Sequence, residues 1–247
     1  MHKFAVVIPF YQRQSGILMK AVQSILAQTV AADRVHIVIV DDGSPVSARL
    51  ELAGLSDPRI QIIEQANAGP AAARNKALDN VASDVEFVAF LDSDDEWTPD
   101  HLANADIALG ASDFYFSDFF QLGQTVSAFN RAGRINVHSH RPIVGTVHHY
   151  DGDMFDQVLS GNIIGTSTVV YRYAKFPTLR FREAFVNAGE DYLFWLELAQ
   201  LTKNISFSSA CECTYGKGVN IFSGSGWGHI VLHNSESAQE SCLHSVS

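Results

Sequence analysis

Three carboxylates gather within four residues of this chain, at Asp92-Ser93-Asp94-Asp95. The segment before them, Phe87–Leu91, is continuously apolar and predicts a buried strand. Like charges at this spacing repel one another, and a divalent cation that prefers hard oxygen ligands, such as Mg²⁺ or Mn²⁺, would neutralise them. The other interpretation is an acidic loop that caps the next helix, but one cap is enough and Thr98 is expected to supply it. The cluster therefore favours a metal-assisted ligand site at a strand end, where open α/β sheets bind ligands.

A second acidic group, Asp41-Asp42-Gly43-Ser44, follows another apolar run. A carboxylate there can accept a hydrogen bond from the ring N–H of a base, but the same residue types are also typical of a turn and helix cap. The segment Asn67–Asn75 is rich in small residues, and its Arg74 can pair with a diphosphate. The alternative for this segment is an alanine-rich helix with an exposed arginine. Neither a Gly-x-Gly-x-x-Gly nor a Gly-Lys-Ser/Thr pattern is present, so a dinucleotide fingerprint and a P-loop are not expected.

The last polar group is Glu190-Asp191, which opens a predicted helix over Asp191–Leu201. Carboxylates in a first helical turn interact favourably with the helix dipole, so the two residues can be a capping pair. If they face the same cleft as the other groups, one of them is a candidate general base, a role that contributes roughly 10²–10⁴ in rate. The residues alone leave both interpretations open.

These groups need a scaffold that brings several strand ends together. Strands and helices alternate through the first half of the chain, which predicts a mostly parallel sheet with helices on both faces. The predicted strands are Phe4–Ile8 (closed by Pro9), Val35–Val40, Ile60–Ile63 and Phe87–Leu91. The predicted helices are Ile17–Gln28, Pro70–Asn80 and Pro99–Leu109.

The pattern changes after Asp118. The segment Gln121–Tyr150 is irregular and predicts loops or a short hairpin on the binding face, and the elements expected after it are a helix over Asp153–Leu159 and a strand over Ser167–Tyr171. The three cysteines form no regular framework, which argues against a disulfide scaffold. Two of them alternate on an expected strand and should point to one face, as buried thiols or, less simply, as redox or metal groups. The cysteines are Cys211, Cys213 and Cys242.

Composition narrows the function classes. The 247 residues are 47% hydrophobic, enough for one large or two small domains, and the net charge of −10 disfavours an extended nucleic-acid surface. The start, Met1-His2-Lys3, leads directly into a predicted strand, and no apolar stretch reaches the ~20 residues of a transmembrane helix. We therefore expect a cytoplasmic protein without a signal peptide. The polar segment His233–Ser247 is expected to be a disordered tail or the point at which a longer chain was cut.

Together the motifs, in this order, resemble the inverting glycosyltransferases of family 2. The resemblance covers residues 1 to about 202 and implies an α/β nucleotide-diphospho-sugar transferase (GT-A) fold, with a mostly parallel central sheet flanked by helices. It also implies a nucleotide-sugar-binding half over residues 1–118 and an acceptor-side half of the same domain over 119–232. The matching segments are Val6–Tyr11, Val40–Ser44, Asn67–Asn75, Phe90–Asp95 with Trp97, and Gly189–Leu196.

The resemblance also implies a role for each site residue. The turn from Pro9 to Tyr11 and the Asp42 carboxylate would hold the uracil of a UDP-sugar, and Arg74 would lie near the base or diphosphate. Asp92 would contact the ribose, with Ser93 beside it in the donor site. Asp94 would hold the Mn²⁺ or Mg²⁺ that bridges the phosphates. Asp191 would deprotonate the acceptor hydroxyl, supported by Glu190, so that one displacement inverts the anomeric carbon.

The implied enzyme is a metal-dependent hexosyltransferase that moves a sugar, with glucose favoured, from UDP to a glycan or lipid-linked oligosaccharide in bacterial cell-surface or exopolysaccharide biosynthesis. The family often carries extra C-terminal sequence, which would bring it to the inner face of the cell membrane. One alternative is a non-catalytic nucleotide-sugar-binding module or partner subunit. Another, a nucleotidyltransferase, is disfavoured because the loop Pro9–Gly16 has one glycine and little positive charge.

The glycine-rich segment Gly216–Gly228 is similar to part of the succinoglycan-type transferases of this family. It can be a lid over the donor or a surface linker, and the sequence leaves both open. His229 and His233 are candidates for a further metal ligand, although isolated histidines more often serve packing or lie in solvent.

Overall fold

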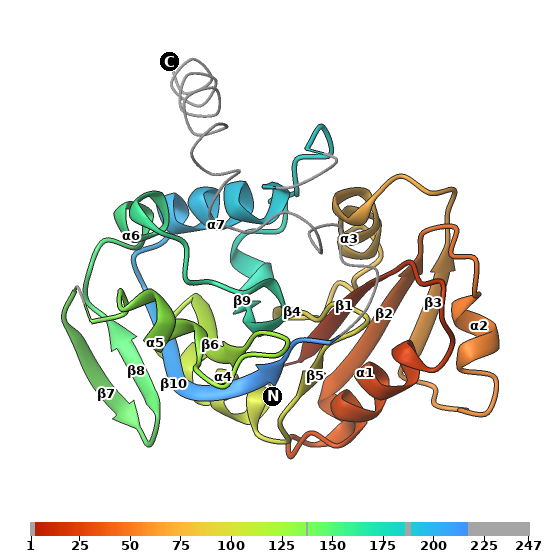
Figure 1. Cartoon of the computed structure of the whole chain (residues 1–247), viewed down its shortest axis with the longest axis horizontal. Helices are drawn as coiled ribbons and strands as arrows, with labels where there is room; N and C mark the ends of the chain where they lie inside the picture. The colour runs from red at the N-terminus through yellow and green to blue at the C-terminus, as the bar shows by residue number, and fades with distance from the viewer. Residues whose placement is uncertain (1–2, 137, 186–188, 217–247) are drawn as a thin grey trace.

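A computed structural model describes residues 3–136, 138–185 and 189–216. Its framework is a single ten-stranded sheet in which nine strands follow the order β3-β2-β1-β4-β9-β6-β10-β8-β7 and β5 pairs with β10 (Figure 1). The strands are β1 (Phe4–Phe10), β2 (Val35–Asp41), β3 (Ile60–Glu64), β4 (Phe87–Phe90), β5 (Glu96–Trp97), β6 (Phe114–Phe120), β7 (His140–Val144), β8 (Val147–Tyr150), β9 (Val170–Tyr171) and β10 (Ile205–Thr214).

Helices cover both faces of this sheet (Figure 1). One apolar core lies under α1, α2 and α4, and the other lies under α3, α5, α6 and α7. The α-helices are α1 (Ile17–Leu26), α2 (Ala48–Glu51), α3 (Pro70–Leu78), α4 (His101–Leu109), α5 (Ala128–Ala132), α6 (Met154–Ser160) and α7 (Glu190–Leu201), and three 3-10 turns cover Ala32–Arg34, Thr166–Thr168 and Tyr173–Lys175. The α/β class with a mostly parallel centre is confirmed, since β3, β2, β1 and β4 are parallel neighbours.

The expectation that Pro9 closes the first strand is wrong. Pro9 lies inside β1, in register with Val40 of β2. The carbonyl of Val7 faces β4 and accepts from Leu91, whereas the carbonyl of Phe10 faces β2 and accepts from Asp42. The Pro9 nitrogen points toward the β4 side, where pairing between β1 and β4 has already ended at Val7. The missing N–H of proline therefore costs no ladder hydrogen bond.

The predicted cap Thr98 is also wrong. Helix α4 begins at His101, and its N-cap residue is Asp100, with no side-chain cap hydrogen bond. Instead, the carbonyl of Thr98 accepts a hydrogen bond from the side chain of Gln28, and its N–H donates one to the carbonyl of Glu212. This ties the start of α4 to the end of α1 and to β10, so tertiary bonds replace a local cap.

The second half of the chain completes the sheet begun by the first. Strand β10 pairs in parallel with β6, and the hairpin β7–β8 extends the sheet beyond β10. A hairpin within the irregular segment is thus confirmed, but it forms the sheet edge farthest from β3. The segment also contains the short helix α5, which was not predicted. In the region predicted as one strand over Ser167–Tyr171, a 3-10 turn precedes the two-residue strand β9.

Cys211 and Cys213 both lie in β10, but two register shifts interrupt its pairing with β6 at these residues. The simple alternation expected for them is therefore broken. Cys213 is buried and Cys211 is half-buried. Desolvation raises the pKa of the Cys213 thiol well above its usual value and that of Cys211 to about 11, which disfavours a reactive thiolate at either position. Cys242 lies outside the described residues. Within the described part of the chain, no helix has the length and apolarity to cross a membrane.

Candidate functional site

The acidic turn after β4, Asp92-Ser93-Asp94-Asp95, is held in place by hydrogen bonds to the side chain of Ser167. The Ser167 hydroxyl donates to Oδ2 of Asp95 and accepts from the backbone N–H of Asp92 at 2.9 Å. Asp95 is 2% exposed and also accepts from the N–H of Gly216 at 2.9 Å. Burial, together with the negative charges of Asp92 and Asp94, holds the pKa of Asp95 well above its usual value. The inner carboxylate is thus part of the scaffold, while Asp92 and Asp94 are half-buried.

Arg74 connects this turn to the start of α7. Its guanidinium, 4% exposed, donates from Nη2 to Oδ1 of Asp92 at 2.6 Å and from Nη1 to Oε1 of Glu190 at 3.2 Å. It also lies over the ring of Phe181, 5.2 Å from the centroid, and its buried Nε has no hydrogen-bond partner among the described residues. The interpretation of α3 as an alanine-rich helix with an exposed arginine is therefore wrong. The small alanines around Arg74 instead let α3 pack closely enough to bury the cation.

Glu190 and Asp191 occupy different environments in the first turn of α7. Glu190 is buried at 8% exposure, and desolvation followed by the charge of Asp191 raises its pKa against the opposing effect of Arg74. Asp191 is half-buried, and its Oδ2 accepts from the Thr166 hydroxyl at 3.1 Å. Gly189 turns the chain into the helix with a φ of 93°, a conformation that glycine tolerates without strain. Of the pair, Asp191 is the one whose carboxylate a substrate can more readily reach.

The acidic turn after β2 is satisfied mainly by backbone N–H groups. Asp41 accepts from Ser44 at 2.8 Å and from Ala48 at 2.9 Å, which matches the turn-and-cap interpretation. Asp42 accepts at 2.8 Å from the N–H groups of Ala68 and Gly69, and its 3% exposure leaves the carboxylate almost enclosed. The side chain of Gln65 donates to Asp42 as well, at 2.8 Å. This turn therefore shapes the loop that leads into α3.

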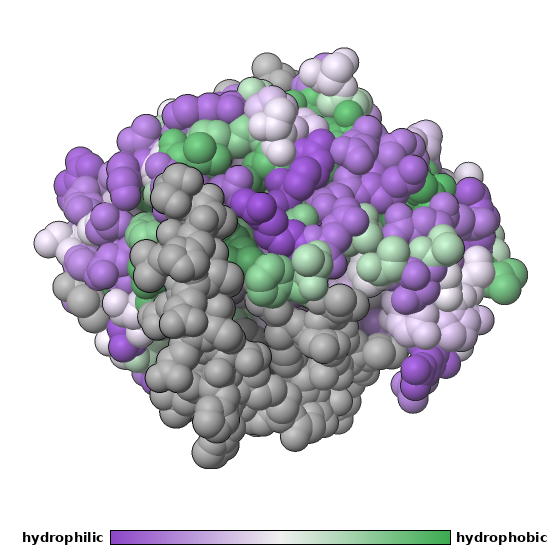
Figure 2. Space-filling model, turned by 90° about the horizontal axis from the view of Figure 1, so that it is seen from above, coloured by the Kyte–Doolittle hydropathy of each residue, from purple (hydrophilic) through white to green (hydrophobic). Residues whose placement is uncertain are grey.

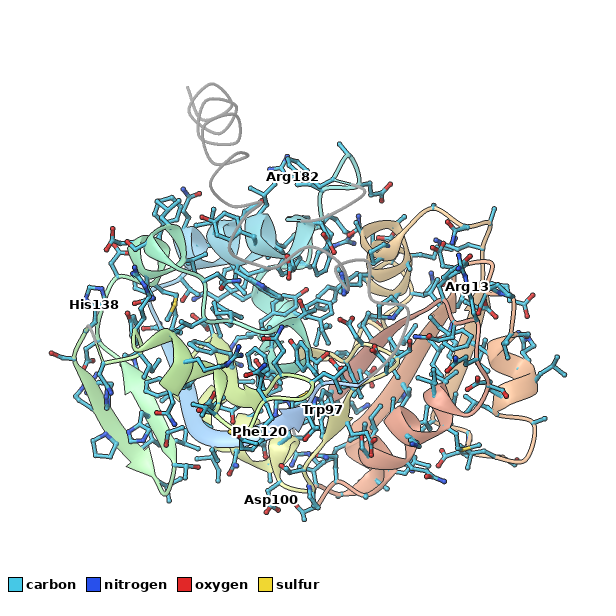
Figure 3. All side chains as sticks on the ribbon, viewed as in Figure 1. Arg13, Trp97, Asp100, Phe120, His138 and Arg182 are labelled. Atoms are coloured by element: carbon cyan, nitrogen blue, oxygen red, sulfur yellow. The ribbon has the colours of Figure 1, made fainter. Side chains whose placement is uncertain are left out.

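The loop after β1 lies between the two acidic turns. Gln12 receives a hydrogen bond from Ser44 on its carbonyl and donates one from its backbone to the Ser44 hydroxyl, both at 2.9 Å. Its side-chain Nε2 donates to the buried Ser93 hydroxyl at 3.1 Å. Pro9 and Tyr11, expected in the donor site, are half-buried beside this bridge. In Figure 3 the neighbouring Arg13 marks this end of the sheet, and His138 marks the opposite end.

The structure therefore brings the ends of β1, β2 and β4 together with the start of α7. All nine predicted site residues lie at these strand ends, in the turns that follow them, at the start of α7 or on α3. Figure 2 shows the molecule from above, where hydrophilic side chains dominate the described surface. Sequence reasoning missed the residues that connect the groups. Thr166 holds Asp191, Ser167 holds the β4 turn and accepts on its carbonyl from the Trp97 indole at 2.6 Å, and Gln12 joins two loops. A run of small hydroxyl residues before an apolar strand, Gly165–Thr168, was the available signal.

The donor set of the β4 turn fits a divalent cation of the magnesium type. Such ions keep several waters and bind one or two carboxylates together with substrate phosphates. Within the described ranges no group of three or more His, Cys, Asp or Glu side chains is arranged to hold a metal. Asp92 and Asp94, with Asp95 behind them, would supply one or two carboxylates to an ion that is otherwise bound by substrate phosphates and water. They do not form a closed cage of protein ligands. His229 and His233 lie outside the described residues.

Comparison with known proteins gives one family and several relatives. The model of the family Glycosyl transferase family 2 matches residues 5–125. The succinoglycan biosynthesis protein ExoW of Rhizobium meliloti (strain 1021) is 36% identical over 232 residues, covering 90% of this chain and 71% of the relative. An uncharacterised glycosyltransferase of Rickettsia conorii is 30% identical over 200 residues, 80% of this chain and 30% of its own length. The crystal structure of S. aureus TarS 1-349 in complex with UDP-GlcNAc has a TM-score of 0.70 at 21% identity, and the alignment covers 91% of this chain and 62% of TarS 1-349.

Proposed function

The chain belongs to glycosyl transferase family 2, with the GT-A fold, and we propose that it transfers a glucose-type sugar from UDP to a glycan or lipid-linked oligosaccharide, with inversion. Two relatives support this. ExoW takes part in succinoglycan biosynthesis, and TarS has been crystallised with UDP-GlcNAc. The observation that carries the proposal is the buried Arg74, which bonds Asp92 of one acidic group and Glu190 of the other. Through Arg74, the turn proposed to bind the donor and the two carboxylates proposed to act as the base would form a single site.

On the donor side, we propose that Pro9, Tyr11 and Asp42 hold the uracil and that Asp92 and Ser93 meet the ribose. Asp94 would hold Mn²⁺ or Mg²⁺, which when bound stabilises the negative charge of the departing diphosphate. The role of the chain's own groups is to keep this turn in place. Ser167 and the N–H of Gly216 fix Asp95, and Arg74 offsets part of the repulsion by pairing with Asp92. A preorganised site of this kind needs little rearrangement as charge develops.

On the acceptor side, Asp191 is the proposed base. An acceptor hydroxyl is a weak nucleophile until a carboxylate within hydrogen-bond reach removes its proton. The Thr166 hydroxyl bonds one oxygen of Asp191 and so orients the carboxylate. Glu190 is nearly enclosed and already paired with Arg74, which suits a supporting role. The acceptor determinants would come from the second half of the chain, residues 119–232.

The test is transfer of labelled sugar from UDP-glucose, UDP-galactose and UDP-N-acetylglucosamine into a lipid and glycan fraction, with Mn²⁺ present. Asp191→Asn should lower transfer by about 10²-fold or more, because the base is lost, while UDP affinity stays the same. Tyr173→Phe is the control, since its hydroxyl bonds the backbone carbonyl of Leu78 at the last residue of α3 and not a side chain of the proposed site. Normal turnover by Asp191→Asn would remove Asp191 as the base. Binding of UDP-sugar by the wild type with no turnover for any acceptor would favour a binding module instead.

A further inference from the structure

Tyr215 follows β10 and is fixed in place by contacts on either side of its side chain. Its backbone N–H donates to the carbonyl of Phe120, a residue labelled in Figure 3, at 3.0 Å. Its ring stacks on Phe119, with 4.6 Å between centroids and 22° between planes. The next residue, Gly216, donates its N–H to Asp95 and lies so close to the carbonyl of Asp94 that a side chain there would overlap it. The ring is thus held directly beside the β4 turn.

The hydroxyl of Tyr215 lies over Gly165. A Cβ atom built on Gly165 would be 2.5 Å from the Tyr215 hydroxyl oxygen and 2.8 Å from Cε1 of Phe119. The two residues after Gly165 are Thr166, which bonds the proposed base, and Ser167, which anchors the β4 turn. The hydroxyl therefore lies at the start of the segment that joins the metal-binding side of the site to the base side. A transferred sugar has to lie between these two sides.

The chemistry of the phenol suits contact with a sugar. Carboxylates accept hydrogen bonds but cannot donate them, and this part of the site is rich in carboxylates. Burial, with the negative charge of Asp95, raises the pKa of Tyr215 well above its usual value, so the phenol keeps its proton as a donor. No described residue forms a hydrogen bond with the Tyr215 hydroxyl. A protonated donor in this position is available to an oxygen of a ligand.

We propose that the Tyr215 hydroxyl determines donor specificity by donating a hydrogen bond to a hydroxyl oxygen of the sugar of the bound UDP-sugar. The proposal rests on the proposed function, because it needs a UDP-sugar in the site. Phe119 and Gly165 have positioning roles. The stack fixes the direction of the phenol, and the missing side chain at 165 leaves the space in which its hydroxyl lies.

The test is calorimetric titration of the full chain with UDP and, separately, with whichever of UDP-glucose, UDP-galactose and UDP-N-acetylglucosamine the wild type binds best. Tyr215→Phe keeps the ring stack and removes only the hydroxyl. We expect its affinity for the UDP-sugar to fall by about 2- to 10-fold, the range for one hydrogen bond, while its affinity for UDP is unchanged. Tyr173→Phe, which also removes one phenolic hydroxyl, should change neither affinity.

A second variant tests the geometry. Gly165 has a φ of −93° and a ψ of 132°, which any residue adopts, so Gly165→Ala adds a methyl group without backbone strain. The methyl should displace the phenol and reproduce the selective loss of UDP-sugar affinity. Equal loss of UDP and UDP-sugar affinity in Tyr215→Phe would show a packing role and overturn the proposal, as would no loss of either. Failure of the wild type to bind any of the three UDP-sugars would instead refute the proposed function itself.

Discussion

Two acidic turns of this protein have similar sequences and different environments. The turn after β2 carries Asp41 and Asp42, and the turn after β4 carries Asp92, Asp94 and Asp95. The carboxylates of the first turn accept hydrogen bonds from the backbone N–H groups of Ser44, Ala48, Ala68 and Gly69 and from the side chain of Gln65. In the second turn Asp92 pairs with the buried Arg74, and Asp95 accepts from the hydroxyl of Ser167 and, within the described residues, from a single backbone N–H, that of Gly216.

The difference shows what an acidic turn needs before a metal can be expected there. Backbone N–H groups stabilise the charge of Asp41 and Asp42, so the first turn has no need of a cation. In the second turn, burial and then the negative charges of Asp92 and Asp94 raise the pKa of Asp95. Arg74 pairs with Asp92 and so offsets only part of the charge. The two turns look alike by residue type. They differ in how many hydrogen-bond donors of the protein point at their carboxylates.

The largest expected effect comes from Arg74→Met, which would remove the positively charged guanidinium that pairs with Asp92 of the second turn. Glu190 would keep its burial and lose its partner, and breaking a buried pair in this way costs about 3–5 kcal/mol. We expect a loss of that order in the free energy of unfolding measured with urea, together with loss of transfer. Arg49→Met is the control, because its pair with Glu64 is exposed and should contribute less than about 1 kcal/mol. Equal stability of the two variants would mean that Arg74 does not hold the site together.

A smaller effect is expected from Asp42→Asn, which alters the first turn. An amide cannot accept from all the N–H groups that now bond the carboxylate, and an unsatisfied buried group costs about 1–3 kcal/mol. We expect a modest loss of stability and weaker UDP binding, by the same factor in Mn²⁺ and in chelator, measured by calorimetry. A change in the metal dependence of binding would contradict the distinction between the two turns.

Much of this organisation could be predicted from local sequence. Apolar runs located β1, β2, β3 and β4 within one or two residues, and the polar residues after them marked the site edge. The partners of those polar residues could not be predicted, because Ser167 lies 72 residues from Asp95 and Glu190 lies 116 residues from Arg74. Thr98 failed as a cap for the same reason. Bonds from Gln28 and to Glu212, distant in sequence, determined its position.

The most direct test of the distinction between the two turns is calorimetric titration with UDP, in Mn²⁺ and again in chelator, for the wild type and Asp94→Asn. We expect the wild type to bind UDP more tightly with Mn²⁺ and Asp94→Asn to lose this difference while remaining folded. Removing one charge next to a cation forfeits on the order of several kcal/mol at intermediate dielectric, so the change should be large. Metal-dependent binding of UDP by a folded Asp94→Asn at wild-type affinity would mean that the β4 turn does not hold the metal through Asp94.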